Sequence, residues 1–142
     1  MLYIKLKNTL LQFVRFGIVG LSNTILGYMI YISTLALMRS IQLWPTLDIY
    51  IAQFVMFVLS VAWSFYWNKR FVFKLVIDGE HKFFIALLKT YVTYAFTSLF
   101  LAEFLLYLWV DILKINEFIA PIVTLLITVP LNFVIQKFWA FG

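Results

Sequence analysis

Four long stretches without a charged residue constrain this chain more than any other feature. They cover residues 16–38, 49–68, 90–110 and 118–136, and only Glu103 interrupts the third. About 20 apolar residues, rising 1.5 Å each in a helix, span a hydrocarbon core of about 30 Å. Because lipid offers no partner for free backbone N–H and C=O groups, each stretch is predicted to be a transmembrane helix.

The composition also indicates lipid as the solvent. Of the 142 residues, 65% are hydrophobic and 12% are charged, whereas a soluble domain carries about a quarter charged residues. We therefore expect an all-α membrane protein, with helices at about residues 13–38, 48–68, 83–110 and 117–137 in one domain of residues 1–142. The first helix is predicted to be retained, since Arg15 interrupts the apolar run and no signal-peptide cleavage site follows.

Lysine and arginine are distributed unevenly between the two sides of the predicted bundle. Nine lie before the first helix, around the central loop or near the C-terminus: Lys5, Lys7, Arg15, Lys69, Arg70, Lys74, Lys82, Lys89 and Lys137. Only Arg39 and Lys114 lie in the other two loops. The positive-inside rule then predicts a multi-pass protein of the cytoplasmic (inner) membrane, with both termini in the cytoplasm. The net charge of +5 arises from these lysines and arginines on one side of the membrane. It therefore does not indicate a nucleic-acid partner, and none is expected.

The second and fourth predicted helices end in similar sequences. Residues 64–73, Ser-Phe-Tyr-Trp-Asn-Lys-Arg-Phe-Val-Phe, align with residues 132–141, Asn-Phe-Val-Ile-Gln-Lys-Phe-Trp-Ala-Phe. Arg15 and Lys89 open the first and third spans at corresponding places. This pattern predicts two helical hairpins in parallel orientation, related by an axis along the membrane normal. The alternative is that inner helix ends collect amides, cations and aromatic residues independently.

Each predicted helix carries polar or small residues at helical spacing. The four stripes are Gly20, Asn23 and Gly27; Gln53, Ser60, Ser64 and Trp67; Lys89, Thr93, Glu103 and Tyr107; and Thr124, Thr128, Asn132 and Gln136. Close helix packing is the favoured interpretation for glycine, serine and threonine. The amides lie deeper in the spans and need partners, so they are candidates for ligand contacts.

The charged candidates for a site are Glu103 and the cations at the inner helix ends. A carboxylate within a span costs about 2.5 kcal/mol or more, so such a residue usually faces a cavity, a partner or a proton path. Alternatively, Glu103 reaches the outer surface and pairs with Arg39 or Lys114. The inner cations either bind a phosphate at headgroup level or serve only as anchors. The sequence contains no cysteine and one histidine, and neither a metal, a cofactor nor catalysis is expected.

Three segments resemble the GtrA-like family, small four-span proteins named for a bactoprenol-linked glucose translocase. Residues 15–24, Arg-Phe-Gly-Ile-Val-Gly-Leu-Ser-Asn-Thr, resemble the family's opening R-F-x-x-V-G-x-x-N-T. Residues 64–73 resemble its S/N-F-x-x-N-R/K-x-[WF]-x-F, and residues 132–141 its closing N-F-x-x-x-K/R-x-W-x-F. The third span opens with Leu88-Lys89-Thr90-Tyr91, which does not repeat the first motif.

The resemblance implies flipping of a polyprenyl-phosphate-linked sugar to the outer leaflet, where a glycosyltransferase uses it to build a cell-surface polysaccharide. The motif positions that would hold the phosphate and sugar are Arg15, Asn23, Asn68, Lys69, Asn132 and Lys137. Charge and position add Lys89 and Glu103 as candidate substrate-binding residues. Four helices enclose little space, so flipping also suggests a homodimer.

Two other functions compete with flipping. One is a non-transporting scaffold that recruits or stabilises a membrane glycosyltransferase. The other is a small exporter, which needs an acidic residue at mid-membrane, and Glu103 lies too near one end of its span for that role.

Overall fold

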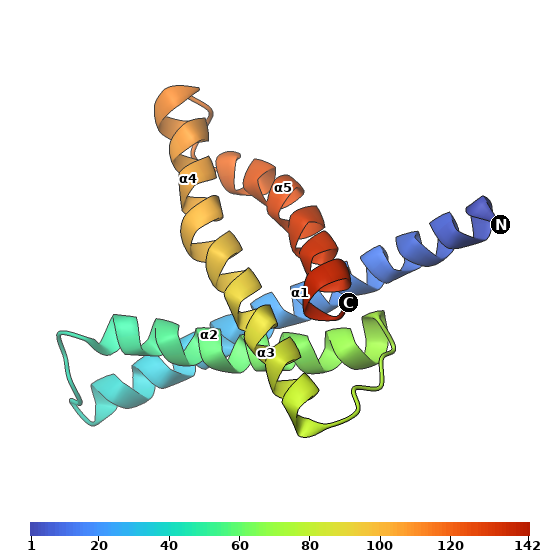
Figure 1. Ribbon diagram of the computed structural model, residues 1–142. Helices are drawn as coiled ribbons and strands as arrows, with labels where there is room; N and C mark the ends of the chain where they lie inside the picture. Colours follow the sequence, from blue (N-terminus) through green and yellow to red (C-terminus); the bar gives the residue numbers. More distant parts are fainter. The chain divides into compact units, whose positions relative to one another are not determined.

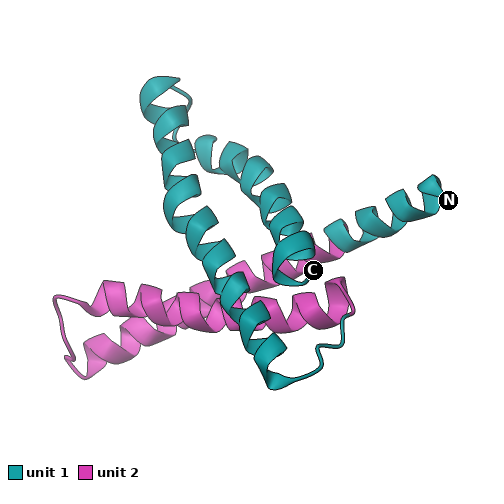
Figure 2. Cartoon of the chain, viewed as in Figure 1, with its two compact units in different colours: residues 1–13, 75–142 teal, residues 14–74 magenta.

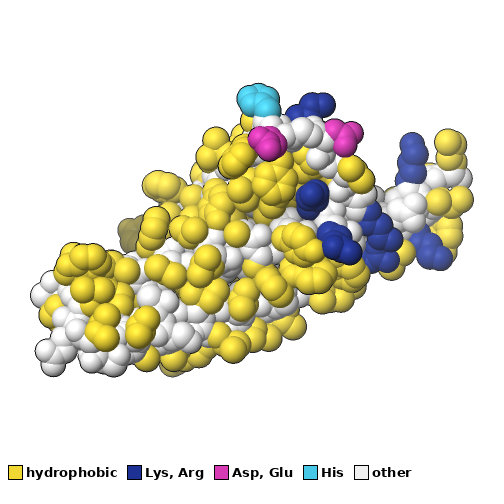
Figure 3. Space-filling model, turned by 90° about the horizontal axis from the view of Figure 1, so that it is seen from below, with side chains coloured by type: hydrophobic (Ala, Val, Ile, Leu, Met, Phe, Trp, Pro, Cys, Tyr) yellow, Lys and Arg dark blue, Asp and Glu magenta, His cyan; other side chains and the backbone are white.

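The computed structural model describes residues 1–142, and all of its regular elements are helical (Figure 1). Four helical segments are long and apolar enough to cross a membrane: Leu2–Ser40, Asp48–Val72, Glu80–Ile112 and Ala120–Ala140. Hydrophobic side chains are spread over the face displayed in Figure 3, with lysines, arginines, acidic side chains and a histidine among the other groups. The prediction of an all-α, multi-pass membrane protein is confirmed. The side on which the termini lie stays a prediction.

The first helix is longer than the sequence analysis predicted. Helix α1 (Leu2–Ser40) begins about eleven residues before the expected start, so Lys5 and Lys7 are helical. Its 39 residues extend about 58 Å, well beyond a hydrocarbon core of about 30 Å. A charge-free run marks the part of a helix that lipid can surround, and a helix continues beyond it where lysines meet water.

The other three spans combine α-helix with π-helical turns. Helix α2 (Asp48–Trp67) continues into η1 (Asn68–Val72). The third span consists of α3 (Glu80–Ala95), η2 (Phe96–Leu101), α4 (Ala102–Tyr107) and η3 (Leu108–Ile112). Helix α5 (Ala120–Ile135) continues into η4 (Gln136–Ala140). Turns of π-helix are rare and are frequently found at functional sites, and both η1 and η4 lie within the repeated segments.

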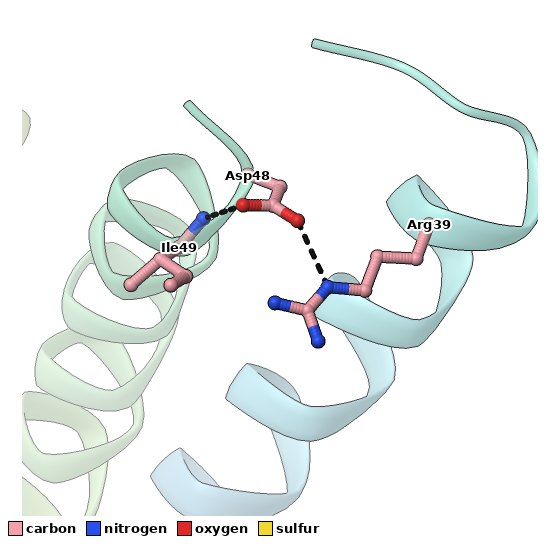
Figure 4. A network of polar contacts seen from close by, with 3 residues as sticks. All are labelled: Arg39, Asp48 and Ile49. Atoms are coloured by element: carbon pink, nitrogen blue, oxygen red, sulfur yellow. Dashed lines mark hydrogen bonds and ion pairs between the residues drawn. The ribbon is translucent and has the colours of Figure 1, made fainter. Parts of the chain in front are cut away.

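The chain divides into two compact units, residues 14–74 and residues 1–13 with 75–142 (Figure 2). In the unit of residues 14–74, α1 packs closely on α2 at Gly27, where a Cβ atom would lie 3.4 Å from Cγ of Met56. The Trp63 indole donates a hydrogen bond to the Ser22 hydroxyl, at 3.2 Å. Where α2 begins, Arg39 Nε lies 2.9 Å from Asp48 Oδ2 (Figure 4).

In the unit of residues 1–13 and 75–142, called the C-terminal unit below, residues 1–13 of α1 pack against the end of α5. The Phe13 and Phe133 rings meet edge to face with centroids 5.4 Å apart. The Lys137 ammonium donates to the Thr9 hydroxyl at 3.2 Å. Helix α3 contacts η4, and α4 contacts α5. These contacts make the N-terminal segment part of the C-terminal unit.

Burial follows the internal repeat. Between the second and fourth spans, buried residues recur at a constant offset of 68: Ala52 and Ala120, Ser60 and Thr128, Phe65 and Phe133, Asn68 and Gln136, and Val72 and Ala140. Between the first and third spans the offset is 74, and it pairs the buried Phe16 with Thr90 and Val19 with Thr93. The two hairpins therefore enclose equivalent positions, which independent anchoring of helix ends does not explain.

The paired alanines offer a test of this packing. Ala52 has 0% exposure, so Ala52→Leu is expected to destabilise the fold by about 1–3 kcal/mol through overpacking. Ala62 lies on the same helix and is exposed, so Ala62→Leu is expected to change stability by less than about 0.5 kcal/mol. Unfolding in detergent micelles, followed by circular dichroism, measures both. Equal effects of the two substitutions would contradict the assigned buried face.

The predicted orientation can be tested because the chain has no cysteine. A single Ser40→Cys variant places a thiol beside the loop between α1 and α2, and His81→Cys places one in the first turn of α3. We expect an impermeant maleimide to label position 40 in intact cells and position 81 only after permeabilisation. The reverse pattern would place both termini outside.

Candidate functional site

Two contacts between a cation and an aromatic ring occupy equivalent places in the two hairpins. Arg15 Cζ lies 5.3 Å from the centroid of Phe71, and Lys89 Nζ lies 5.4 Å from that of Trp139. By the two offsets, Arg15 corresponds to Lys89 and Phe71 corresponds to Trp139. We call these contacts the Arg15–Phe71 clamp and the Lys89–Trp139 clamp.

Each clamp fixes its cation while leaving hydrogen-bond donors available. Attraction to an aromatic face contributes about 0.5–1 kcal/mol at exposed sites. Lys89 also donates to the Trp139 carbonyl oxygen at 3.3 Å, which uses one of its three N–H groups. Arg15 presents a planar guanidinium, whose fork of donors matches a phosphate. The arrangement is suited to holding an anion at the predicted cytoplasmic ends of both hairpins.

The amides Asn68 and Gln136 begin the π turns that carry the two aromatic rings. Both side chains are fully buried, and Asn68 Nδ2 donates to the Ser64 hydroxyl at 3.2 Å. The backbone carbonyl of Asn68 accepts from the Phe73 N–H at 2.8 Å, and the backbone carbonyl of Gln136 accepts from the Phe141 N–H at 2.9 Å. The Asn68 side chain therefore lies against α2, next to Ser64, at the start of the turn that carries Phe71.

Asn132 lies deeper in the C-terminal unit and meets a hydroxyl from the third span. Thr97 Oγ1 is 2.8 Å from Asn132 Oδ1 and 2.9 Å from the Thr93 carbonyl oxygen. A hydroxyl has one proton, so both contacts are satisfied together when the amide turns and its NH₂ donates to Thr97. Sequence analysis did not identify Thr97, although it lies eight residues after Lys89, as Asn23 does after Arg15.

The N-terminal hairpin has the equivalent residue types in exchanged places. Asn23 corresponds to Thr97, and Ser64 corresponds to Asn132. The amide therefore lies on the first helix of the N-terminal hairpin and on the second helix of the C-terminal hairpin. The Asn23 side-chain oxygen is buried and accepts no hydrogen bond. Leaving a buried acceptor without a donor costs about 1–3 kcal/mol, so a hydroxyl that reached the Asn23 oxygen would be bound favourably.

An apolar hollow of about 240 Å³ adjoins the Arg15–Phe71 clamp, because Phe71 belongs to both. Its lining consists of Ile18, Val19, Ser22, Trp63, Trp67 and Phe71. The Trp67 indole N–H is buried and has no acceptor. Aromatic faces beside an unused donor suit a sugar ring or an isoprenoid chain. Spacing by four residues from Trp63 to Trp67 and Phe71 is the sequence signal for this face.

Next to the Lys89–Trp139 clamp the hollow has a different character. It measures about 440 Å³ and is lined by residues 75–78, Lys82, Ile85, Ala86, Lys89 and residues 140–142. Two lysines and Asp78 make this hollow charged, whereas its counterpart in the other unit is apolar. The two hairpins therefore share the clamp, and the residues that line the adjoining hollow differ between them.

The other two predicted cations, Lys69 and Lys137, lie outside the two clamps. Lys69 is half-buried in η1. Lys137 bonds to Thr9 and lies over the Phe133 and Phe138 rings, 5.7 Å from each centroid. Lys89, Asn132, Lys137 and Glu103 belong to one unit, and Arg15, Asn23, Asn68 and Lys69 to the other.

Glu103 does not share a face with the start of its span. Its side chain and that of Tyr107 are exposed, whereas Thr93 is buried. The predicted stripe through all three is wrong because η2 lies between them, and a π turn shifts the helical register. Arg39, one of the two cations considered as a partner for Glu103, pairs with Asp48 within residues 14–74.

The family model described as GtrA/DPMS, transmembrane domain, matches residues 15–141. The chain belongs to this family. The match begins at Arg15 and ends at Phe141, so it contains both clamps and confirms the resemblance identified in the sequence. No curated protein and no solved structure matches the chain. Membership of the GtrA/DPMS family indicates a membrane protein of lipid-linked sugar processes.

Proposed function

We propose that this protein translocates a polyprenyl-phosphate-linked sugar across the cytoplasmic membrane for cell-surface polysaccharide synthesis. The observation that carries the proposal is the pair of equivalent clamps, Arg15–Phe71 and Lys89–Trp139, in two hairpins with the same buried pattern. A translocator has to receive its cargo's charged group at a membrane surface. Two clamped cations provide binding groups for that phosphate.

The proposed substrate has three chemically distinct parts, and the site offers a partner for each. The phosphate binds the guanidinium of Arg15 or the ammonium of Lys89. The sugar lies against the hollow lined by Trp67, whose indole N–H can donate to a sugar hydroxyl. The polyprenyl tail stays in the lipid around the exposed apolar faces of the helices.

Movement of the headgroup requires polar side chains along the spans, because a charge in the hydrocarbon centre costs several kcal/mol. In the C-terminal unit, Thr90, Thr93 and Thr97 are buried on the third span. Thr128 is buried on α5, one turn before Asn132. We propose that these groups exchange their present partners for the headgroup as it passes. No bond of the substrate is made or broken, so the protein is not an enzyme in this account.

A second candidate function is a scaffold for a membrane glycosyltransferase. One observation favours it: the Thr90, Thr93 and Thr124 hydroxyls each bond a carbonyl four residues earlier in their own helix, at 2.8–2.9 Å. Such hydroxyls are satisfied within the helix and serve close packing. A scaffold would use these faces only for assembly and would show no transport alone.

Reconstitution of the purified full chain tests the proposal against the scaffold. Liposomes would contain a fluorescent polyprenyl-phosphate sugar, and an impermeant reductant would quench the label in the outer leaflet. Translocation predicts that protein removes the protected fraction of fluorescence. A protected fraction equal to that of empty liposomes, with folded protein, would favour the scaffold. Crosslinking in the same liposomes would show whether a homodimer forms.

A further inference from the structure

We propose that one face of α1, formed by Lys5, Leu6, Thr9, Leu10 and Phe13, binds an anionic phospholipid of the inner leaflet together with Phe133 and Lys137. The proposal concerns a site separate from the clamps and does not depend on translocation. Residues 5–13 lie outside residues 15–141, which match the family. They form a helix that packs on the C-terminal unit.

An apolar hollow of about 420 Å³ lies where this helix meets α5. Its lining consists of Lys5, Leu6, Thr9, Leu10, Phe13 and Phe133. The five residues from α1 recur at helical spacing, so they form one face. Their hydrocarbon surface is shaped by the edge-to-face contact of Phe13 with Phe133. This hollow lies just before the charge-free span that begins at residue 16, so a lipid at headgroup level can place the first part of its chain against these walls.

Two cations stand at the hollow, and no acidic residue lines it. Lys5 is exposed, and the Lys137 ammonium is held by the Thr9 hydroxyl at 3.2 Å. Lys5 and Thr9 are one helical turn apart, about 6 Å between Cβ atoms. The flexible Lys5 side chain can therefore join Lys137 around one phosphate group.

The lining favours a phospholipid over the proposed sugar-linked cargo. The only uncharged polar side chain in the lining is Thr9, and it already accepts from Lys137. A sugar headgroup would find a single hydroxyl and no amide or indole N–H there, in contrast to the hollow beside Arg15. A chain with an anionic headgroup, such as phosphatidylglycerol, satisfies both the apolar walls and the lysines.

Native mass spectrometry of the full chain in detergent, with equimolar phosphatidylglycerol and phosphatidylcholine, tests this site. We expect wild type to retain one phosphatidylglycerol preferentially. Lys5→Gln should weaken retention about fivefold, as one lysine near an anionic surface contributes about 1 kcal/mol, and Lys5→Glu should weaken it further. Lys7→Glu is the matched control, because it makes the same charge change two residues away without lining the hollow, and should bind like wild type.

Several results would overturn the proposal. These are equal retention of the two lipids, equal loss in Lys5→Glu and Lys7→Glu, or displacement of phosphatidylglycerol by a lower concentration of polyprenyl phosphate. Circular dichroism would verify that the variants are folded, and Lys5→Gln provides the milder change. Since the assay records binding without transport, failure of translocation would leave this result unaffected.

Discussion

Replacement of Arg15 by alanine is expected to slow headgroup translocation by about 10- to 100-fold. A hydrogen bond between a charged donor and a phosphate contributes about 1.5–3 kcal/mol, and each 1.4 kcal/mol corresponds to a factor of ten. The Arg15–Phe71 clamp holds the guanidinium with its donors available, so most of this contribution should be lost. The initial rate in reconstituted liposomes measures the effect.

The neighbouring Arg70 provides the matched control for charge. It is exposed, and its guanidinium bonds the Tyr66 hydroxyl at 2.9 Å. Arg70→Ala removes the same positive charge from the same end of the unit without touching either clamp, and should change the rate less than about twofold. Arg15→Lys should restore part of the rate, because an ammonium still binds phosphate without the bidentate fork. Equal loss in Arg15→Ala and Arg70→Ala would indicate only a general effect of surface charge.

Replacement of Asn132 by leucine is expected to reduce translocation about tenfold or more while changing stability little. The Thr97 hydroxyl keeps the Thr93 carbonyl as acceptor at 2.9 Å when the amide is removed, so no buried donor loses its partner. The headgroup, in contrast, loses a polar partner on its path through a low-dielectric region, where such a group contributes about 1–3 kcal/mol. Rates normalised to folded protein, together with unfolding curves, separate the two effects.

A double-mutant cycle with Thr97→Val shows whether the pair acts together. Residues in direct contact usually couple by about 0.5–3 kcal/mol. We expect coupling of this size in the translocation rates of Thr97→Val, Asn132→Leu and the double variant. Loss of stability in Asn132→Leu with an unchanged rate per folded molecule would assign the pair to packing and favour the scaffold.

The membrane spans could be predicted because a charge inside hydrocarbon is so costly that its absence marks each span. The helix ends could not, since charged residues such as Lys5 and Lys7 are accommodated in a helix that leaves the bilayer. The π turns were also missed. One extra residue per turn leaves no signature in composition, yet it moved Glu103 off the face expected from a period of 3.6.

The cations of the candidate site could be predicted, and their partners could not. Arg15 and Lys89 were identified from charge and position, but the rings of Phe71 and Trp139 are brought to them only by the turns η1 and η4. Asn68 was predicted to contact substrate, and this stays a prediction; its side chain is buried and donates to the Ser64 hydroxyl. The alignment of the two repeats contained a usable signal, since it places Arg15 with Lys89 and Phe71 with Trp139.

The most direct test is the rate at which the purified protein moves a polyprenyl-phosphate sugar across a bilayer that contains no other protein. We expect rapid loss of the protected fluorescence with wild type and slow loss with a variant combining Arg15→Ala and Lys89→Ala, because both clamps are then removed. Wild-type liposomes that keep their protected fluorescence as empty liposomes do, or a combined variant as fast as wild type, would contradict translocation through the clamps.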